Sequence, residues 1–173
     1  MTYDRTTIVF HWTTAALVVA LWCIGQTADW FPKGAARGVV WSTHFTLGFA
    51  LALVWIARLV WRLRGGRRLP GVGPAYMVKL SAAVHGLLYV IIAFVIVVGV
   101  ANLYAHGQNI WGLVSFPKID DAATRRTISE THEWAANVLL LIAAGHAAVA
   151  LLHQFVLRDG VLTRMWPGLA RGA

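Results

Sequence analysis

Three histidines share one stripe of a segment that is otherwise almost entirely apolar. They are His132, His146 and His153, in the stretch ETHEWAANVLLLIAAGHAAVALLH. At about 100° and 1.5 Å per residue, the step from His132 to His146 rises about 21 Å and returns to within about 40° of the same direction. A lone histidine on an apolar face usually satisfies a hydrogen bond inside a bundle. Three on one stripe favour a functional site, because polar groups in hydrocarbon are costly, and imidazole is a common ligand of haem iron.

A six-coordinate haem needs a second histidine that faces the first from another helix at the same depth. If the apolar segments cross a bilayer alternately, His44 is level with His132, and His11 is level with His146. The sequence therefore predicts two level pairs of histidines that could each hold a haem, one near the outer face and one in the inner half. His146 and His153 cannot hold separate haems, because a rise of about 10 Å leaves too little room for two macrocycles.

The cysteine count excludes several other redox centres. Cys23 is the only cysteine, so the chain alone cannot form an internal disulfide, attach haem through a C-x-x-C-H motif or hold an iron–sulfur cluster. The net charge is +8, but in so apolar a chain a basic balance favours cytoplasmic loops and lipid headgroups over nucleic acid. We expect no nucleic-acid partner.

The elements that position the histidines are four long apolar segments. Hydrophobic residues make up 58% of the 173 residues and charged residues 13%, and nine tryptophans favour the lipid–water boundary. Each segment approaches or exceeds the roughly 20 residues that span a bilayer core. We predict an all-α membrane protein, a four-helix transmembrane bundle formed by residues 1–173 as a single domain. Thr127 and Glu130 fit a capping box at the start of the fourth helix, and the first segment does not resemble a cleaved signal. The predicted helices cover about 7–27, 39–63, 77–103 and 131–157.

The distribution of lysine and arginine predicts the orientation. Ten basic residues fall on the side of the two termini and five on the other, so both termini should be cytoplasmic in a bacterial inner membrane. The five outer basic residues are matched by five outer carboxylates, so they can steer an anion only if they cluster. The inner basic residues are Arg5, Arg58, Arg62, Arg64, Arg67, Arg68, Lys79, Arg158, Arg164 and Arg171, and the outer ones are Lys33, Arg37, Lys118, Arg125 and Arg126.

Small and charged residues near the histidines allow two interpretations each. Gly48, one turn after His44, and Gly145, next to His146, would let a flat porphyrin approach the backbone, or they serve ordinary helix packing. Arg58 lies 14 residues after His44. It could pair with a haem propionate, although anchoring in lipid headgroups is the simpler interpretation. His106 follows the third helix in an outer loop, and we assign it no role.

The segments that carry these histidines resemble the bacterial cytochrome b561 family. They are IVFHW, STHFTLG, LSAAVHGLLY and THEWAANVLLLIAAGHAAVALLH, and the likeness runs from about Tyr3 to Pro167 through RLVWRLR and RDGVLTRMWP. It is greatest to the small four-helix diheme superoxide oxidases of that family. The resemblance implies two non-covalent b haems on His11, His44, His132 and His146. It also implies a ubiquinone near the cytoplasmic side in contact with His85 and His153, where His85 could face His153 across the bundle or be a plain interfacial residue.

The resemblance implies an oxidoreductase of electron transport. Superoxide would be oxidised to dioxygen at the periplasmic side, and the electrons would reduce ubiquinone near the cytoplasmic side. An alternative is a non-catalytic cytochrome subunit that links a periplasmic dehydrogenase or hydrogenase, as a redox partner protein, to the quinone pool. A third hypothesis is a haem-free transporter or channel whose histidines line a proton path. The expected partners are therefore superoxide, quinone and membrane lipid, with a periplasmic donor protein in the second hypothesis.

Overall fold

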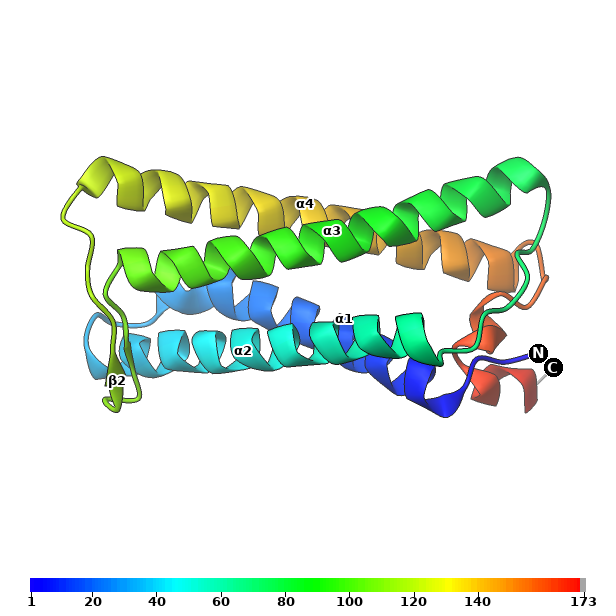
Figure 1. Ribbon diagram of the computed structural model, residues 1–173, viewed down its shortest axis with the longest axis horizontal. Coiled ribbons are helices and arrows are strands. Elements are labelled where there is room, and N and C mark those ends of the chain that lie inside the picture. The colour runs from blue at the N-terminus through cyan, green and yellow to red at the C-terminus, as the bar shows by residue number, and fades with distance from the viewer. Residues whose placement is uncertain (172–173) are drawn as a thin grey trace.

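Four long helices run side by side in the computed structural model, which describes residues 1–171 (Figure 1). Each helix is long and apolar enough to cross a membrane. The predicted class, an all-α membrane protein built as a four-helix bundle, is therefore confirmed. The helices are α1 (Arg5–Thr27), α2 (Ala35–Arg64), α3 (Ala75–Ala105) and α4 (Ala122–Phe155).

The bundle is assembled from two close pairs, α1 with α2 and α3 with α4. A small apolar core joins them at mid-height, formed by Val18, Leu21, Leu51, Ile92 and Leu139. Many other large apolar side chains are exposed, and Leu53, Val90 and Leu141 are 66% to 74% exposed. Such a surface requires a lipid environment, because large exposed apolar patches are unfavourable in water.

Short elements close the two ends of the bundle. At the end away from the termini, the α1–α2 connection contains η1 (Ala28–Trp30), and the α3–α4 connection contains a hairpin of β1 (Asn109–Ile110) and β2 (Val114–Ser115). Trp111 fastens this hairpin to α2, since its backbone N–H donates to Ser42 Oγ at 3.1 Å and its indole N–H to Thr46 Oγ1 at 2.9 Å. At the other end lie η2 (Leu162–Arg164) and η3 (Pro167–Arg171), close to the N-terminus (Figure 1).

Helix α4 begins nine residues before the predicted start at 131, so the predicted capping box is wrong. Asp121 is the N-cap, and its carboxylate accepts the backbone N–H groups of Ala123 and Thr124, both at 3.1 Å. Hydrogen bonds from the Thr124 side chain and from these N–H groups lower the pKa of Asp121. Glu130 is instead inside the helix, where it pairs with Arg126 at 2.6 Å. The polar first turns lie outside the apolar stretch, so a hydropathy pattern could not detect them.

Asp4 joins the start of α1 to the end of α2. Its carboxylate accepts the backbone N–H of Thr7 at 2.9 Å, the Trp61 indole N–H at 3.2 Å and the Arg67 backbone N–H at 3.1 Å. Burial acts to raise the pKa of Asp4, but hydrogen bonds from Thr7, Arg67 and Trp61 outweigh it and lower the pKa from 3.8 to about 2. This carboxylate therefore stabilises the fold fully above about pH 4, and the contribution is lost as the pH falls through about 2.

Replacing Asp4 with alanine should destabilise the protein by about 1 kcal/mol, the usual cost of a lost helix N-cap. Thermal unfolding in detergent near pH 7, followed by circular dichroism, should show a lower midpoint for Asp4→Ala. The matched control is Asp120→Ala, which removes an exposed carboxylate that makes no side-chain hydrogen bond within residues 1–171. Equal midpoints for the two variants would mean that Asp4 does not hold the helix ends together.

Candidate functional site

Each of the four helices carries two chemically distinctive residues 14 positions apart. Since 14 residues correspond to nearly four full turns, the two residues of each helix share a face about 21 Å apart in height. We name the two sets by their distance from the end of the bundle at which the chain termini lie. The outer layer is farther from that end and consists of Gly25, His44, Gly99 and His132. The inner layer is nearer to it and consists of His11, Arg58, His85 and His146.

The outer layer brings together the two histidines that the sequence paired at this depth. The imidazole centroids of His44 on α2 and His132 on α4 are 6.3 Å apart, with their planes at 78°. Each ring packs against a glycine of the neighbouring helix. A Cβ on Gly25 would lie 3.6 Å from His44 Cε1, and a Cβ on Gly99 would lie 2.9 Å from His132 Cε1. The glycines therefore leave the space that the imidazoles occupy.

A cavity of about 580 Å³ surrounds the two outer histidines. Gly25, Gly48 and Gly99 all line it, together with apolar side chains of the mid-height core. A single metal atom bound to one nitrogen of each ring at about 2 Å requires ring centroids about 6 Å apart. The observed separation satisfies that requirement, and the volume falls in the range of roughly 300–1,000 Å³ that is typical of cofactor sites.

The hydrogen bonding of the outer rings also fits a metal-centred group. The Nδ1 atoms of His44 and His132 are buried without a hydrogen-bond partner of ordinary geometry. The backbone carbonyls of Leu21 and Val95 are the acceptors that approach these two rings. A metal-bound histidine commonly donates its second ring N–H to a backbone carbonyl. The outer layer thus has the donor set and the surroundings that a bis-imidazole haem needs.

The outer end of this cavity is polar. Gln26, His106 and Glu133 line it, and Ser129 Oγ donates to Asn102 Oδ1 at 2.9 Å across the α3–α4 contact. His106, for which the sequence predicts no role, lies in the cavity wall. The signal that could have found it is its position directly after α3, seven residues or about two turns beyond Gly99, which lies level with His132.

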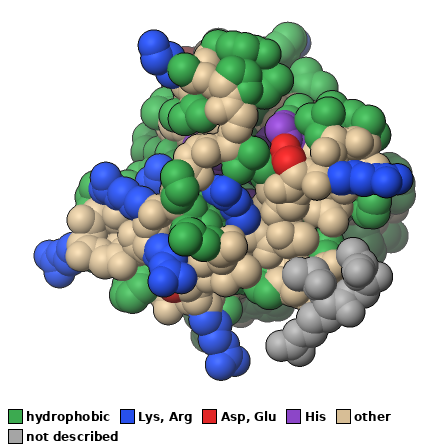
Figure 2. All heavy atoms as spheres, turned by 90° about the vertical axis from the view of Figure 1, so that its right-hand side faces the viewer, with side chains coloured by type: hydrophobic (Ala, Val, Ile, Leu, Met, Phe, Trp, Pro, Cys, Tyr) green, Lys and Arg blue, Asp and Glu red, His purple; other side chains and the backbone are tan. Residues whose placement is uncertain are grey.

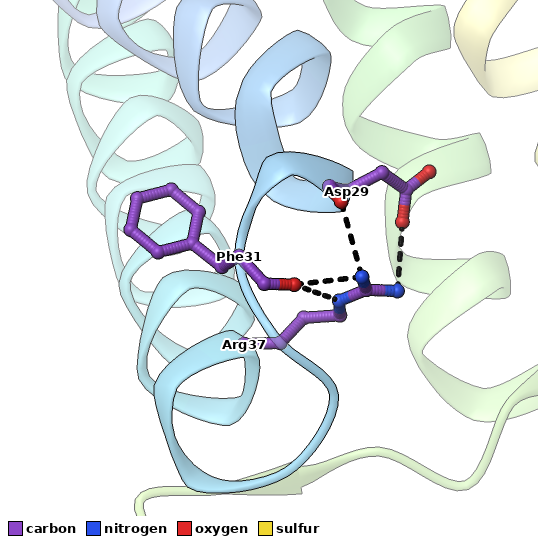
Figure 3. Close-up of polar contacts among 3 residues, drawn as sticks. All are labelled: Asp29, Phe31 and Arg37. Carbon is purple, nitrogen blue, oxygen red and sulfur yellow. Dashed lines mark hydrogen bonds and ion pairs between the residues drawn. The ribbon is translucent and has the colours of Figure 1, made fainter.

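Two of the five outer basic residues are paired with carboxylates. Arg37 forms an ion pair with Asp29 at 3.0 Å and donates to the backbone carbonyl of Phe31, as Figure 3 shows. Arg126 is paired with Glu130. Within residues 1–171, Lys118 makes no ion pair and forms a backbone bridge with His106, which places it beside the cavity wall.

The inner layer brings three imidazoles and one guanidinium together. The centroids of His11 and His146 are 6.3 Å apart, the same separation as in the outer pair. His85 lies closer to His146, at 5.0 Å, which is too short for a metal atom between the two rings. The guanidinium Nη2 of Arg58 is 3.4 Å from His11 Nδ1. The separations therefore favour His11 and His146 as the inner ligand pair.

Arg58 does not point to the headgroups, contrary to the simpler interpretation of the sequence. It is half-buried and stacks on the Tyr89 ring, with 5.1 Å between its Cζ and the ring centroid. A cation over an aromatic face gains electrostatic attraction, and the ring also shields it from lipid. Arg58 lies on the same face of α2 as His44, in the inner layer. This position directs its side chain toward the bundle interior.

His85 and His153 occupy different surroundings, and no contact between them is found in residues 1–171. The Nδ1 of His85 donates to the Ser81 carbonyl at 2.6 Å. His153, at the end of α4, contacts Asp159 Oδ2 through Nδ1 at 2.5 Å. Burial acts to raise the pKa of Asp159, but the hydrogen bonds from the His153 side chain and the Val161 N–H outweigh it and lower the pKa.

The glycines that contact the histidines are not those singled out in the sequence. A Cβ on Gly48 or Gly145 would meet open space, although Gly48 does line the outer cavity. Gly25 and Gly99 are the glycines against which the rings pack. The 14-residue spacing could have identified both, since Gly25 follows His11 and Gly99 follows His85 by that interval.

Substituting Gly99 should disturb the outer site more than substituting any other glycine of the cavity. In Gly99→Ala the new methyl group would lie 2.9 Å from His132 Cε1, so the imidazole must shift. Such overpacking usually costs about 1–3 kcal/mol, and we expect a lower haem content of the purified protein. Gly48→Ala, whose methyl group enters open space, and Gly25→Ala, at an ordinary 3.6 Å, are the controls. Full haem occupancy in Gly99→Ala would show that His132 has room to move.

Comparisons with known proteins cover nearly the whole chain. Residues 2–168 match the family described as prokaryotic cytochrome b561. The chain is 27% identical to cytochrome b561 homolog 1 of Escherichia coli K12 over 171 residues, which cover 95% of this chain and 97% of that protein. It is 27% identical to a probable superoxide oxidase, CybB, of Yersinia pestis over 172 residues (95% and 96%). It is 29% identical to cytochrome b562 of Cereibacter sphaeroides over 168 residues (94% of each). Taken with the four-helix bundle and its facing histidines, these matches show that the chain belongs to the prokaryotic cytochrome b561 family of b-haem-binding membrane electron-transfer proteins.

Proposed function

We propose that this protein is a superoxide:quinone oxidoreductase with two b haems. His44 and His132 hold the outer haem, and His11 and His146 hold the inner one. When bound, the haems supply one-electron carriers at two depths of the membrane. In the overall reaction, two superoxide anions each lose one electron to become dioxygen, and one ubiquinone takes up these two electrons and two protons to become ubiquinol. The observation that carries the proposal is the repetition of a 6.3 Å imidazole pair in both layers.

The outer cavity supports the choice of a small donor. Its polar end lies next to Lys118, whose charge would attract an anion toward His106 and the outer histidine pair. Glu133 lines the same cavity and opposes this attraction, so the field must act locally at Lys118. The probable superoxide oxidase among the relatives agrees with such a donor.

The inner end of the bundle supports the choice of a quinone acceptor. Quinone reduction consumes protons, and His85 and His153 are imidazoles near the end where both chain termini lie (Figure 1). Because Nδ1 of His153 is held by Asp159, its Nε2 is left to contact a quinone carbonyl. A ring fixed in this way presents one defined nitrogen to a ligand.

The termini are proposed to face the cytoplasm across the bacterial inner membrane. Figure 2 views the end of the bundle at which the termini lie, and several lysine and arginine side chains are scattered over that face, with few acidic ones. Basic residues concentrate on cytoplasmic loops of membrane proteins. The whole chain, residues 1–173, acts in this proposal as one domain.

A second candidate is a relay that accepts electrons from a periplasmic protein. The observation that favours it is the apolar surface of the outer connections, where Leu113 is 85% exposed and Trp30 is 80% exposed. Exposed apolar side chains of this kind are common where a partner protein docks. In this case the outer haem would receive electrons from a dehydrogenase or hydrogenase instead of from superoxide.

Stopped-flow mixing of the oxidised, purified protein with superoxide separates the two candidates. Superoxide oxidase activity predicts rapid appearance of the reduced haem bands, and a second mixing with ubiquinone should reoxidise them. A Lys118→Gln variant should be reduced more slowly, with a smaller dependence on ionic strength, because local steering has been removed. Haem reduction by dithionite but not by superoxide would favour the relay.

A further inference from the structure

The two layers differ in charge at equivalent positions. On α2 the outer layer has His44 and the inner layer has Arg58, while the remaining outer positions on α1 and α3 are glycines. The inner layer therefore contains a fixed positive charge beside its imidazoles, and the outer layer contains none. The charged side chains that line the outer cavity are the carboxylates of Asp29 and Glu133, and Asp29 is paired with Arg37.

Arg58 is held where its charge acts on the inner site. The guanidinium lies 3.4 Å from His11 Nδ1 and 5.1 Å from the centroid of the Tyr89 ring. Arg62, the next turn along α2, also lies over Tyr89 at 5.6 Å, but its side chain is exposed at the end of the bundle. A charge inside a membrane bundle is costly, and such residues are usually retained for a function. No carboxylate pairs with Arg58 within residues 1–171.

A fixed positive charge stabilises the reduced form of a redox centre. Reduction lowers the charge of the centre by one, so the Coulomb energy with a nearby cation becomes more favourable, and a low-dielectric interior strengthens this effect. Charge and burial near a cofactor are among the means by which a protein sets its reduction potential. The carboxylate of Glu133, which lines the outer cavity, acts in the opposite direction on the outer site.

We infer that Arg58 raises the reduction potential of the inner haem site above that of the outer site and so directs electrons inward. The inference rests on the proposed function, because it assumes one haem in each layer. The direction then follows from the chain itself, since an electron that enters near His44 and His132 is more stable near His11 and His146. Arg58 acts on the inner site through its charge and is not an iron ligand.

A redox titration with chemical mediators tests this inference. The wild-type protein should show two one-electron components, and His44→Ala identifies the component that belongs to the outer site. In Arg58→Met the inner component should move to lower potential while the outer one stays in place. The equilibrium constant for electron transfer from the outer to the inner site should fall about tenfold or more, and tenfold corresponds to 59 mV for a one-electron couple.

Matched variants distinguish charge from structure. Arg58→Lys keeps the charge and should keep most of the potential difference. Arg62→Met removes the same charge at the exposed end and should leave both components unchanged. Arg58→Gln is the second neutral variant, and it should reproduce the shift of Arg58→Met.

Three outcomes would overturn the inference. The first is a neutral Arg58 variant that binds both haems and has unchanged potentials. The second is an equal shift of both components. The third is loss of the inner haem from both neutral variants, which would mean that Arg58 serves to retain the haem. The titration needs neither superoxide nor quinone, so failure of the proposed reaction does not affect it. A haem count of one per chain, measured beforehand by the pyridine haemochrome method, would instead show that the two-haem proposal has failed.

Discussion

Replacing His44 or His132 with alanine is expected to remove the outer haem and to leave the inner haem in place. The converse is expected for His11→Ala and His146→Ala. Each haem would lose one of the two imidazoles that hold it, and among residues 1–171 no other pair of imidazoles has the 6.3 Å separation of these two pairs. The expected haem content is therefore about one per chain in each variant and two in the wild type, measured as the pyridine haemochrome. Acid–acetone should extract all of it, because the chain has no C-x-x-C-H motif.

The histidines outside the two pairs provide the controls. His106→Ala removes an imidazole from the wall of the outer cavity, and His85→Ala removes the ring that lies 5.0 Å from His146. Neither change should lower the haem count. If His85→Ala removed the low-spin spectrum of the inner haem while His11→Ala preserved it, the inner ligands would be His85 and His146.

The architecture of the bundle could be predicted from hydropathy, but the helix starts could not. Apolar composition sets the four crossings because a bilayer core needs about 20 apolar residues for each one. Helix α4 nevertheless begins at Ala122, since Asp121 caps it in a polar region where hydropathy gives no signal. The small hairpin of β1 and β2 was also not predicted, because its strands contain two residues each.

The depth of each histidine along the bundle could be predicted from helix geometry, but the residues of other helices that contact it could not. The rise per residue placed His44 with His132 and His11 with His146, and the structure brings both pairs to the same separation. The packing of His132 against Gly99 depends on which helices are adjacent, and the sequence does not specify adjacency. For the same reason, the sequence leaves open whether Arg58 faces a haem propionate or the lipid headgroups, whereas the structure stacks it on Tyr89 of α3.

The quinone site remains a prediction, and the structure sharpens its test at His153. Nδ1 of this imidazole is fixed by Asp159, and the loop that follows α4 holds the carboxylate through the Val161 N–H, which donates to Asp159 Oδ1 at 3.1 Å. A protonated imidazole donates from both nitrogens. The ring can therefore keep its bond to Asp159 and donate from Nε2 to a quinone carbonyl, which is the arrangement that a reduction coupled to proton uptake needs.

Replacing His153 or His85 with alanine should slow reoxidation of the haems by added ubiquinone and leave both haem spectra nearly intact. A buried carbonyl that loses its hydrogen-bond donor costs roughly 1–3 kcal/mol, which corresponds to about 5- to 150-fold in affinity or rate. Reduction by superoxide should stay fast, because it occurs in the outer layer, about 20 Å or more away from either residue by helix rise. Asp159→Asn should give a smaller slowing, because His153 would remain but would lose its charged partner. The control is His106→Ala, at the outer end, which should be reoxidised at the wild-type rate. Wild-type reoxidation rates in both the His153 and His85 variants would mean that the quinone binds in another part of the bundle.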